Sequence, residues 1–214
     1  ITVLFFLPPP VSIIHGILAQ TFFMATIILA YGLSLERADR LNLDCSTQIK
    51  KGTLILGGLV YIQLILGALM RHTSSGMAIP DFPTMGGLWI PTFSENMIHN
   101  INFILFDLDV DPVSRWQVVL HFIHRLGAII VTGAIGCFAY KYYTTIKKHE
   151  IIFKTMIAII AIVILQFTLG AVTVLTERSP YIASFHVVNG AALLGLCTLF
   201  ALRTNSKNWA GWKV

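Results

Sequence analysis

Residues 152–175 read IFKTMIAIIAIVILQFTLGAVTVL, an apolar run whose one charged side chain is Lys154. About 20 consecutive apolar residues suffice for a helix to cross the hydrocarbon core of a bilayer. Comparable runs lie near residues 11–33, 52–71, 116–140 and 182–203. The sequence therefore predicts an all-α polytopic membrane protein with about five transmembrane helices.

The composition supports this class. Hydrophobic residues make up 56% of the chain and charged residues 12%, and the mean hydropathy is +0.76, well outside the range of soluble domains. The first run is not preceded by a charged leader and a small-residue cleavage site, so we expect it to remain as a helix. The net charge of +5 comes without a clustered basic and aromatic surface, so the expected partner is the lipid bilayer and not nucleic acid.

Basic residues predict the orientation, because short cytoplasmic loops are enriched in Lys and Arg. The long loop between residues 71 and 115 has no internal Lys or Arg but five acidic residues, so we expect it to face outward. The loops expected to face inward carry Arg37, Arg40, Lys50, Lys51, Lys141, Lys147 and Lys148, and the tail carries Arg203, Lys207 and Lys213.

Two histidines lie inside apolar runs at similar depth. At about 1.5 Å per residue, His124 is roughly 12 Å below Trp116 and His186 roughly 8 Å below Tyr181. An ionisable side chain in a membrane is costly and usually has a partner or a function, and imidazole is the commonest protein ligand for metals. One such histidine alone is as readily explained by an interhelical hydrogen bond. Two at one depth favour shared ligation of a metal.

An internal repeat relates the runs that carry these histidines. The pattern Gln-x-x-Leu-Gly-Ala occurs at residues 63–68 and again at residues 166–171, each time in the run before a histidine run. His124 and His186 are each followed by Gly-Ala within five residues. We therefore expect two related helical hairpins in one four-helix bundle, with the glycines mainly allowing close packing and the glutamines forming interhelical hydrogen bonds.

These motifs resemble the second half of haem A synthase. The similar segments are YIQLILGALMRHTSSGMAIPDFP at residues 61–83, HFIHRLGA at residues 121–128, and the run from residue 166 to 190. HGILAQTFF at residues 15–23 is similar to the last helix of that family's first half. The resemblance divides the chain into residues 1–51, the last helix of a truncated substrate half with its inner loop, and residues 52–214, a haem-binding bundle.

The resemblance implies a function and a set of site residues. His124 and His186 match the axial ligands of a b-type haem, and His15 matches one histidine of the catalytic site for haem O. There the ring methyl of haem O is oxidised to a formyl by successive hydroxylations with loss of water, which gives haem A. The implied protein is an oxidoreductase of the bacterial plasma membrane, or alternatively of the mitochondrial inner membrane, with its histidines near the outer face. It would be supplied by a haem O synthase and by an unidentified electron donor.

Arg125 and His121 flank the histidine site, and each has two explanations. Arg125 either neutralises a haem propionate or reaches lipid headgroups or Asp81, and the sequence favours neither. His121, one turn from His124, either supports the site or serves packing, and we favour packing. The cysteines are expected to form no disulfide and to act as small buried hydrophobic residues, with a reactive thiol as the less favoured alternative; they are Cys45, Cys137 and Cys197.

The chain departs from the family in ways that keep a second function open. A second histidine for the substrate site, the glutamate of the family's second helix and the paired outer cysteines have no counterpart, so we expect a fragment that is inactive alone. The alternative is a non-catalytic b-type haem protein, either an electron carrier or an assembly factor. A transporter is disfavoured because no helix pattern is broken in mid-membrane.

Overall fold

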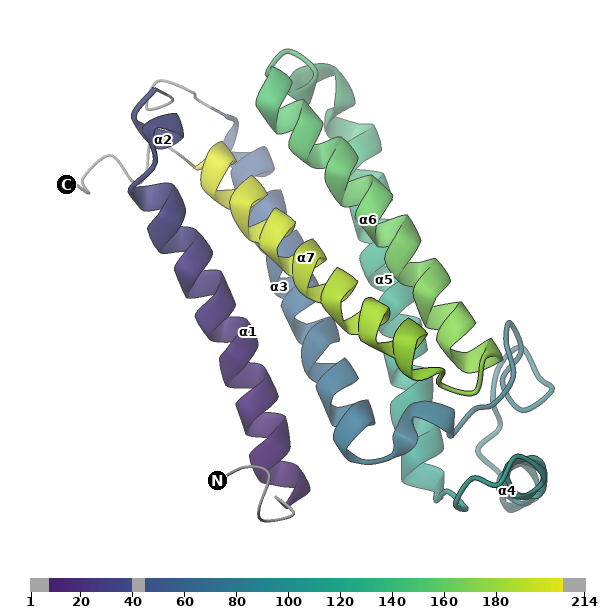
Figure 1. The fold of residues 1–214 in the computed structure, drawn as a ribbon. Helices are drawn as coiled ribbons and strands as arrows, with labels where there is room; N and C mark the ends of the chain where they lie inside the picture. Colours follow the sequence, from purple (N-terminus) through teal and green to yellow (C-terminus); the bar gives the residue numbers. More distant parts are fainter. Residues whose placement is uncertain (1–7, 40–44, 206–214) are drawn as a thin grey trace.

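The computed structural model describes residues 8–39 and 45–205, and in these ranges the regular structure is helical. Five helices are long and apolar enough to cross a membrane, which confirms the predicted class. They are α1 (Pro9–Gly32), α3 (Thr47–His72), α5 (Arg115–Ile146), α6 (Glu150–Leu175) and α7 (Pro180–Thr204) (Figure 1).

Four of the long helices close a bundle. α3 contacts α5 and α7, and α6 contacts α5 and α7, so each helix has two neighbours in the ring. α1 packs on the outside, against α3 and α7 (Figure 1). The predicted hairpins are therefore α3–α5 and α6–α7, and they pack side by side.

Local signals explain where these helices begin. Ser46 caps α3 by accepting a hydrogen bond from the N–H of Ile49, and Ser114 forms a capping box with Gln117 at the start of α5. α1 and α7 begin with proline in the first turn, where its missing N–H costs nothing. α3 starts five residues before the apolar run 52–71, and α5 ends six residues after the apolar run 116–140. Each helix therefore continues through a polar turn outside its apolar stretch.

The bundle core consists of aliphatic side chains from the four helices, with Phe138 against Phe200 in an edge-to-face contact. At one end, Arg203 of α7 donates two hydrogen bonds to the carboxylate of Glu36, at 2.7 and 2.8 Å. Glu36 belongs to the short helix α2 (Leu35–Asp39). We call this the basic end and define it by Lys50, Lys147 and Arg203; it is the end predicted to be cytoplasmic.

The opposite end, which we call the loop end, has a second core that the sequence did not predict. It contains the short helices η1 (Ser75–Met77) and α4 (Glu95–Asp107). α4 buries Ile98, Ile101 and Leu105 against the loop, and its N-terminus is capped by Ser94. Its apolar stretch is too short to span a bilayer, so it did not stand out from the loop in hydropathy.

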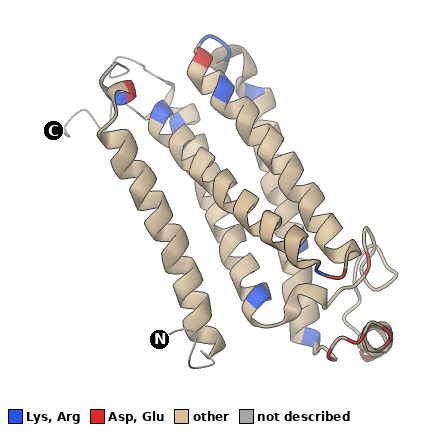
Figure 2. Cartoon of the chain, viewed as in Figure 1, with Lys and Arg blue, Asp and Glu red and all other residues tan. Residues whose placement is uncertain are grey.

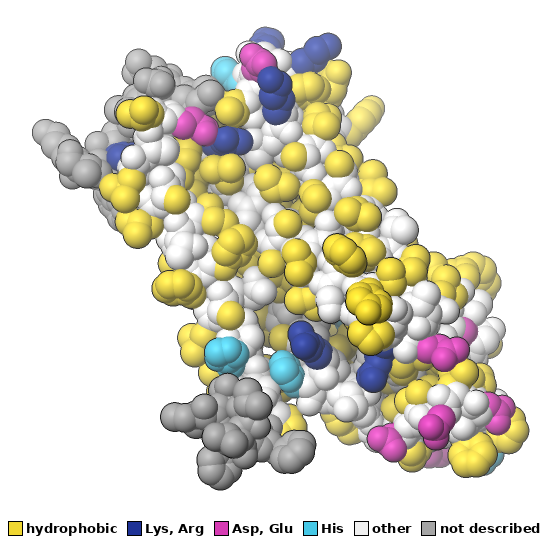
Figure 3. Space-filling view, viewed as in Figure 1, with side chains coloured by type: hydrophobic (Ala, Val, Ile, Leu, Met, Phe, Trp, Pro, Cys, Tyr) yellow, Lys and Arg dark blue, Asp and Glu magenta, His cyan; other side chains and the backbone are white. Residues whose placement is uncertain are grey.

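The surface matches a membrane protein. Hydrophobic side chains cover most of the visible face of the bundle in Figure 3, and charged ones gather towards its two ends. Figure 2 shows acidic residues around α4, at the loop end. The three cysteines all lie in the described ranges, and none forms a disulfide there; Cys45 and Cys197 are buried as expected, whereas Cys137 is exposed on α5, so the expectation of burial was wrong for Cys137.

Candidate functional site

His124 of α5 contacts Gln63 of α3. The Gln63 side-chain Nε2 donates to the backbone carbonyl of His124 at 2.8 Å and lies 3.2 Å from its ring Nδ1. Gln63 thus spans the hairpin and holds both the backbone and the ring of His124. The prediction that the repeated glutamine forms an interhelical hydrogen bond is confirmed here.

His186 of α7 contacts the repeat-related Gln166 of α6. The Gln166 Nε2 lies 3.3 Å from Nε2 of the imidazole, and its Oε1 accepts a hydrogen bond from Asn189 at 2.8 Å. The same Asn189 amide nitrogen also donates to the carbonyl of Ile162 at 3.1 Å, so two hydrogen bonds to α6 fix the Asn189 side chain. Asn189 was given no role from the sequence, although an asparagine one turn from a membrane histidine is a signal for such a contact.

The repeated glycines make room for the two rings. A β-carbon at Gly67 would lie 3.4 Å from Cε1 of His124, and one at Gly170 would lie 3.2 Å from Cε1 of His186. A β-carbon at Gly127 would overlap the Gln63 amide, and one at Gly190 would lie 3.2 Å from the Gln166 amide. Close packing is therefore what the glycines provide, as expected, and the repeat extends to the contacts around each histidine.

Each ring keeps one nitrogen without a hydrogen bond among the described residues. His186 Nδ1 is buried and has no partner there, while the described contacts of the His124 ring involve Nδ1 and leave Nε2 unbonded. The two imidazoles are near enough for a charge on one to act on the other. A buried nitrogen without a partner costs free energy unless a ligand satisfies it. His186 Nδ1 is such an atom, and together with the unbonded Nε2 of His124 it makes the two imidazoles candidates for holding a ligand.

His121 and Arg125 hold the loop next to this site. His121 is buried, and its Nδ1 and Nε2 face the N–H of Ile79 at 3.2 Å and Nε of Arg125 at 3.0 Å. A neutral imidazole has one acceptor nitrogen, so it accepts one of these bonds at a time. His121 thus packs α5 against the loop, which agrees with the explanation that the sequence favoured.

Within the described ranges, the Arg125 guanidinium donates to backbone carbonyls and to no carboxylate. Its guanidinium donates to the carbonyls of Ile79 at 2.9 Å and Thr84 at 3.1 Å, and it lies over the Phe82 ring at 5.9 Å from the centroid. Three of its five N–H groups face partners, if the contact with His121 is included, so two remain for a further ligand. The propionate role predicted for Arg125 stays a prediction.

Asp81 stabilises the turn of the same loop. Its carboxylate accepts hydrogen bonds from the N–H groups of Gly86 at 2.6 Å and Gly87 at 2.9 Å. Burial raises the pKa of the Asp81 carboxyl, but hydrogen bonds from Thr84, Gly87 and Gly86 outweigh burial and leave that pKa below its usual value. Gly86 and Gly87 both have positive φ, which glycine adopts without strain.

His15 stands apart from the other two candidate ligands. It lies on α1 and is exposed, and a β-carbon added at the next residue, Gly16, would lie 3.8 Å from Cβ of Ala68 on α3. The other histidines lie at helix ends or in α4; they are His72, His99 and His149. The described residues contain no group of three or more His, Cys, Asp or Glu side chains that could hold a metal ion. The candidate centre is therefore the pair His124 and His186.

Comparison with known proteins adds independent evidence. The model of a family described as "Cytochrome oxidase assembly protein" matches residues 2–198. Similar curated proteins include "Heme A synthase" of Orientia tsutsugamushi strain Boryong, 30% identical over 199 residues, which are 89% of this chain and 51% of that protein. "Heme A synthase" of Rickettsia massiliae is 32% identical over 195 residues, or 85% of this chain and 52% of the relative. The chain thus spans about half the length of these relatives.

Proposed function

Since the chain belongs to the haem A synthase family, we propose that it comprises the haem-binding second half of such an enzyme and the last helix of its first half. In this proposal residues 52–214 form the haem-binding bundle and residues 1–51 belong to the substrate half. α3 begins at Thr47, so its first turn lies on the substrate side of this boundary. The observation that carries the proposal is the repeat-related pair of imidazoles, each held by a glutamine and each with one unbonded nitrogen.

The proposed cofactor is a b-type haem with His124 and His186 as axial ligands. Held by these two imidazoles, the haem would supply electron transfer. Gln63 and Gln166 orient the two rings, and Gly67 leaves the space in which the His124 ring lies. Groups that hold a ligating histidine are a normal part of a metal site and tune its affinity.

The loop at the loop end has a proposed supporting role. Arg125 ties this loop, through Ile79 and Thr84, to the helix turn that follows His124. A loop fixed in this way limits the access of water to the histidine pair. The free N–H groups of Arg125 are the proposed partners of a haem propionate.

The proposed reaction of the full-length protein is oxidation of the ring methyl of haem O to the formyl of haem A. His15 is the proposed catalytic residue present here, as a ligand of the substrate iron. Its exposed position on α1 leaves it open to a further part of the protein. The proposed setting is a bacterial plasma membrane, with the histidines towards the outer face, a haem O synthase as supplier of substrate and a separate electron donor.

The positions of the glutamates support a second candidate function. Glu36 is bound to Arg203, and Glu95 and Glu150 pair with Arg115 and Lys154. Glu177 lies in the turn after α6. None of these four glutamates lies in a long helix next to His15. This arrangement suits a non-catalytic b-type haem protein, either an electron carrier or an assembly factor.

Chromatography of extracted haems separates the two functions. Full-length protein co-expressed with a haem O synthase should accumulate haem A, and His15→Ala should abolish haem A while the bound b-type haem remains. The 214-residue chain alone should make none. Haem A from this chain alone, or unchanged haem A in the His15→Ala protein, would contradict the assignment of His15 to a separate substrate site.

A further inference from the structure

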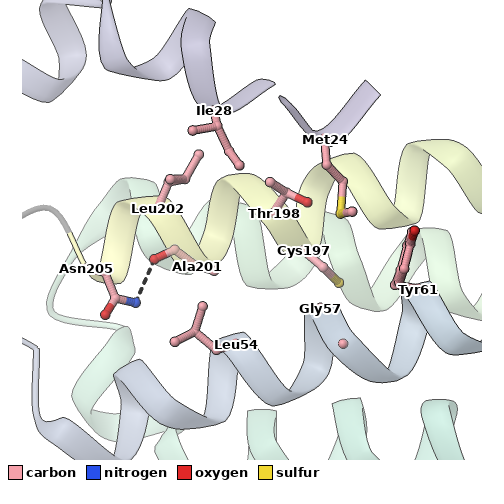
Figure 4. A pocket seen from close by; sticks show the side chains of 11 residues that line it. Met24, Ile28, Leu54, Gly57, Tyr61, Cys197, Thr198, Ala201, Leu202 and Asn205 are labelled. Atoms are coloured by element: carbon pink, nitrogen blue, oxygen red, sulfur yellow. Dashed lines mark hydrogen bonds between the residues drawn. The ribbon is translucent and has the colours of Figure 1, made fainter. Parts of the chain in front are cut away.

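A second site lies away from the histidines, between α1, α3 and α7. It is a cavity of about 470 Å³ (Figure 4). Cys197 and Asn205 of α7 line it, and they follow His186 by 11 and 19 residues, or about 16 and 28 Å along the helix. Its other lining residues are Met24, Ile28, Leu54, Gly57, Gly58, Tyr61, Thr198, Ala201 and Leu202.

The cavity exists because α1 is held away from α3 at this level. A β-carbon at Gly57 or Gly58 would meet no atom within 4 Å. Towards the loop end, the hydroxyls of Thr21 and Tyr61 share a hydrogen bond of 2.6 Å, which joins α1 to α3. At the basic end α2, which follows α1, is tied to α7 by Glu36 and Arg203. The glycine pair between these two connections leaves the space unfilled.

The walls select a hydrocarbon chain. The lining is almost entirely apolar, and its polar groups already have partners: Tyr61 bonds Thr21, and Asn205 donates to the carbonyl of Ala201 at 2.8 Å. A buried water needs two to four polar partners, which these walls do not offer. Leu54 is 59% exposed, so the cavity opens at the apolar surface of the described bundle, where an acyl chain could enter.

The charges at the basic end indicate which lipid enters. Lys50 lies four residues before Leu54 and seven before Gly57, so the three share one face of α3. Lys51 precedes Gly58 by seven residues in the same way and is exposed. Basic side chains next to a membrane surface attract anionic headgroups by about 1 kcal/mol each. We propose that this cavity binds one acyl chain of an anionic phospholipid whose headgroup lies beside Lys50 and Lys51.

Native mass spectrometry of the purified full-length protein tests this site with dioleoyl phosphatidylglycerol as the probe. The wild type should retain this lipid more strongly than dioleoyl phosphatidylcholine, which has the same chains. Gly57→Leu projects into the cavity, where a β-carbon would meet no atom within 4 Å, and should weaken binding at least tenfold. Gly133→Leu on α5 is the matched control, because a β-carbon there also meets nothing within 4 Å. Lys51→Gln should reduce the preference for the anionic lipid.

Several results would overturn the proposal. Equal retention by the wild type and Gly57→Leu would exclude the cavity, and equal loss in Gly133→Leu would indicate surface lipid only. Tighter binding of farnesol or another isoprenoid than of the phospholipid would assign the cavity to a different ligand. If Gly57→Leu does not fold, Gly58→Leu takes its place. A crystal of the wild type with brominated acyl chains needs no variant, and bromine density only outside the cavity, away from Met24 and Thr198, would also contradict it.

Discussion

Gln63 on α3 and His124 on α5 are bound to each other twice, once through the histidine backbone at 2.8 Å and once through its ring nitrogen at 3.2 Å. In a neutral imidazole, the nitrogen that accepts from an amide leaves the proton on the other nitrogen. Binding of a metal by His124 Nε2 would put the proton on Nδ1, and the Gln63 amide would then have to turn its oxygen towards Nδ1 and give up its bond to the His124 carbonyl. The orientation of the Gln63 amide is therefore coupled to metal binding by His124.

Replacing Gln63 should weaken the haem site without unfolding the bundle. Gln63→Leu keeps the volume but removes the partner of the His124 ring, and loss of such partners typically lowers metal affinity about 10–100-fold. Haem titration of the purified apoprotein, followed by absorption, measures this change. Thr132→Ala on α5, the helix that carries His124, is the control, since Thr132 bonds only the carbonyl of Ala128 in its own helix among the described contacts. Equal affinities for wild type and Gln63→Leu would refute the role of Gln63.

Replacing Arg125 should release the loop that it binds. Each hydrogen bond to a charged group contributes about 1.5–3 kcal/mol, and Arg125→Ala removes those to Ile79 and Thr84. Amide hydrogen exchange over residues 78–88 should become at least tenfold faster in Arg125→Ala. Arg71→Ala, at the exposed end of α3, should leave this exchange unchanged. Slow exchange in the Arg125→Ala loop would show that other contacts hold it.

The same loop should loosen in acid. The pKa of Asp81 is lower in the folded loop than in an unfolded chain, so its ionised form stabilises the fold. This contribution is complete above its ordinary value of about 4 and is lost as the pH falls through the lower folded value. Trp89 fluorescence between pH 6 and pH 2.5 should therefore report loop opening below about pH 4. Asp81→Asn should open less steeply with pH, and an identical profile would exclude Asp81 as the titrating group.

Cysteine labelling tests the predicted orientation of the bundle. Cys45 is buried and reacts poorly, so Lys148→Cys and Ser94→Cys are better probes, in a protein whose three native cysteines are replaced. An impermeant thiol reagent should label Ser94→Cys from outside the cell and Lys148→Cys only after permeabilisation, because basic loops stay inside. Reversed labelling would place the histidine pair towards the inner face.

The spans and the interhelical contacts of the repeated glutamines could be predicted from the sequence, because hydropathy and the repeat are local patterns. The repeat placed Gln63 and Gln166 in the helices that precede His124 and His186, and the structure shows both glutamines in contact with those histidines. Arg125 illustrates what could not be predicted. Its acceptors are backbone carbonyls of a loop more than 40 residues away, and no residue type marks a carbonyl. The apolar face of α4 became visible only with the loop packed against it.

The central claim is that His124 and His186 bind one haem iron together, and electron paramagnetic resonance tests it most directly. The oxidised, haem-loaded protein should give a low-spin spectrum of two axial imidazoles. His124→Ala and His186→Ala should each remove that signal or convert it to high spin, whereas His99→Ala and His149→Ala should leave it unchanged. A low-spin spectrum that survives in both His124→Ala and His186→Ala would contradict the claim.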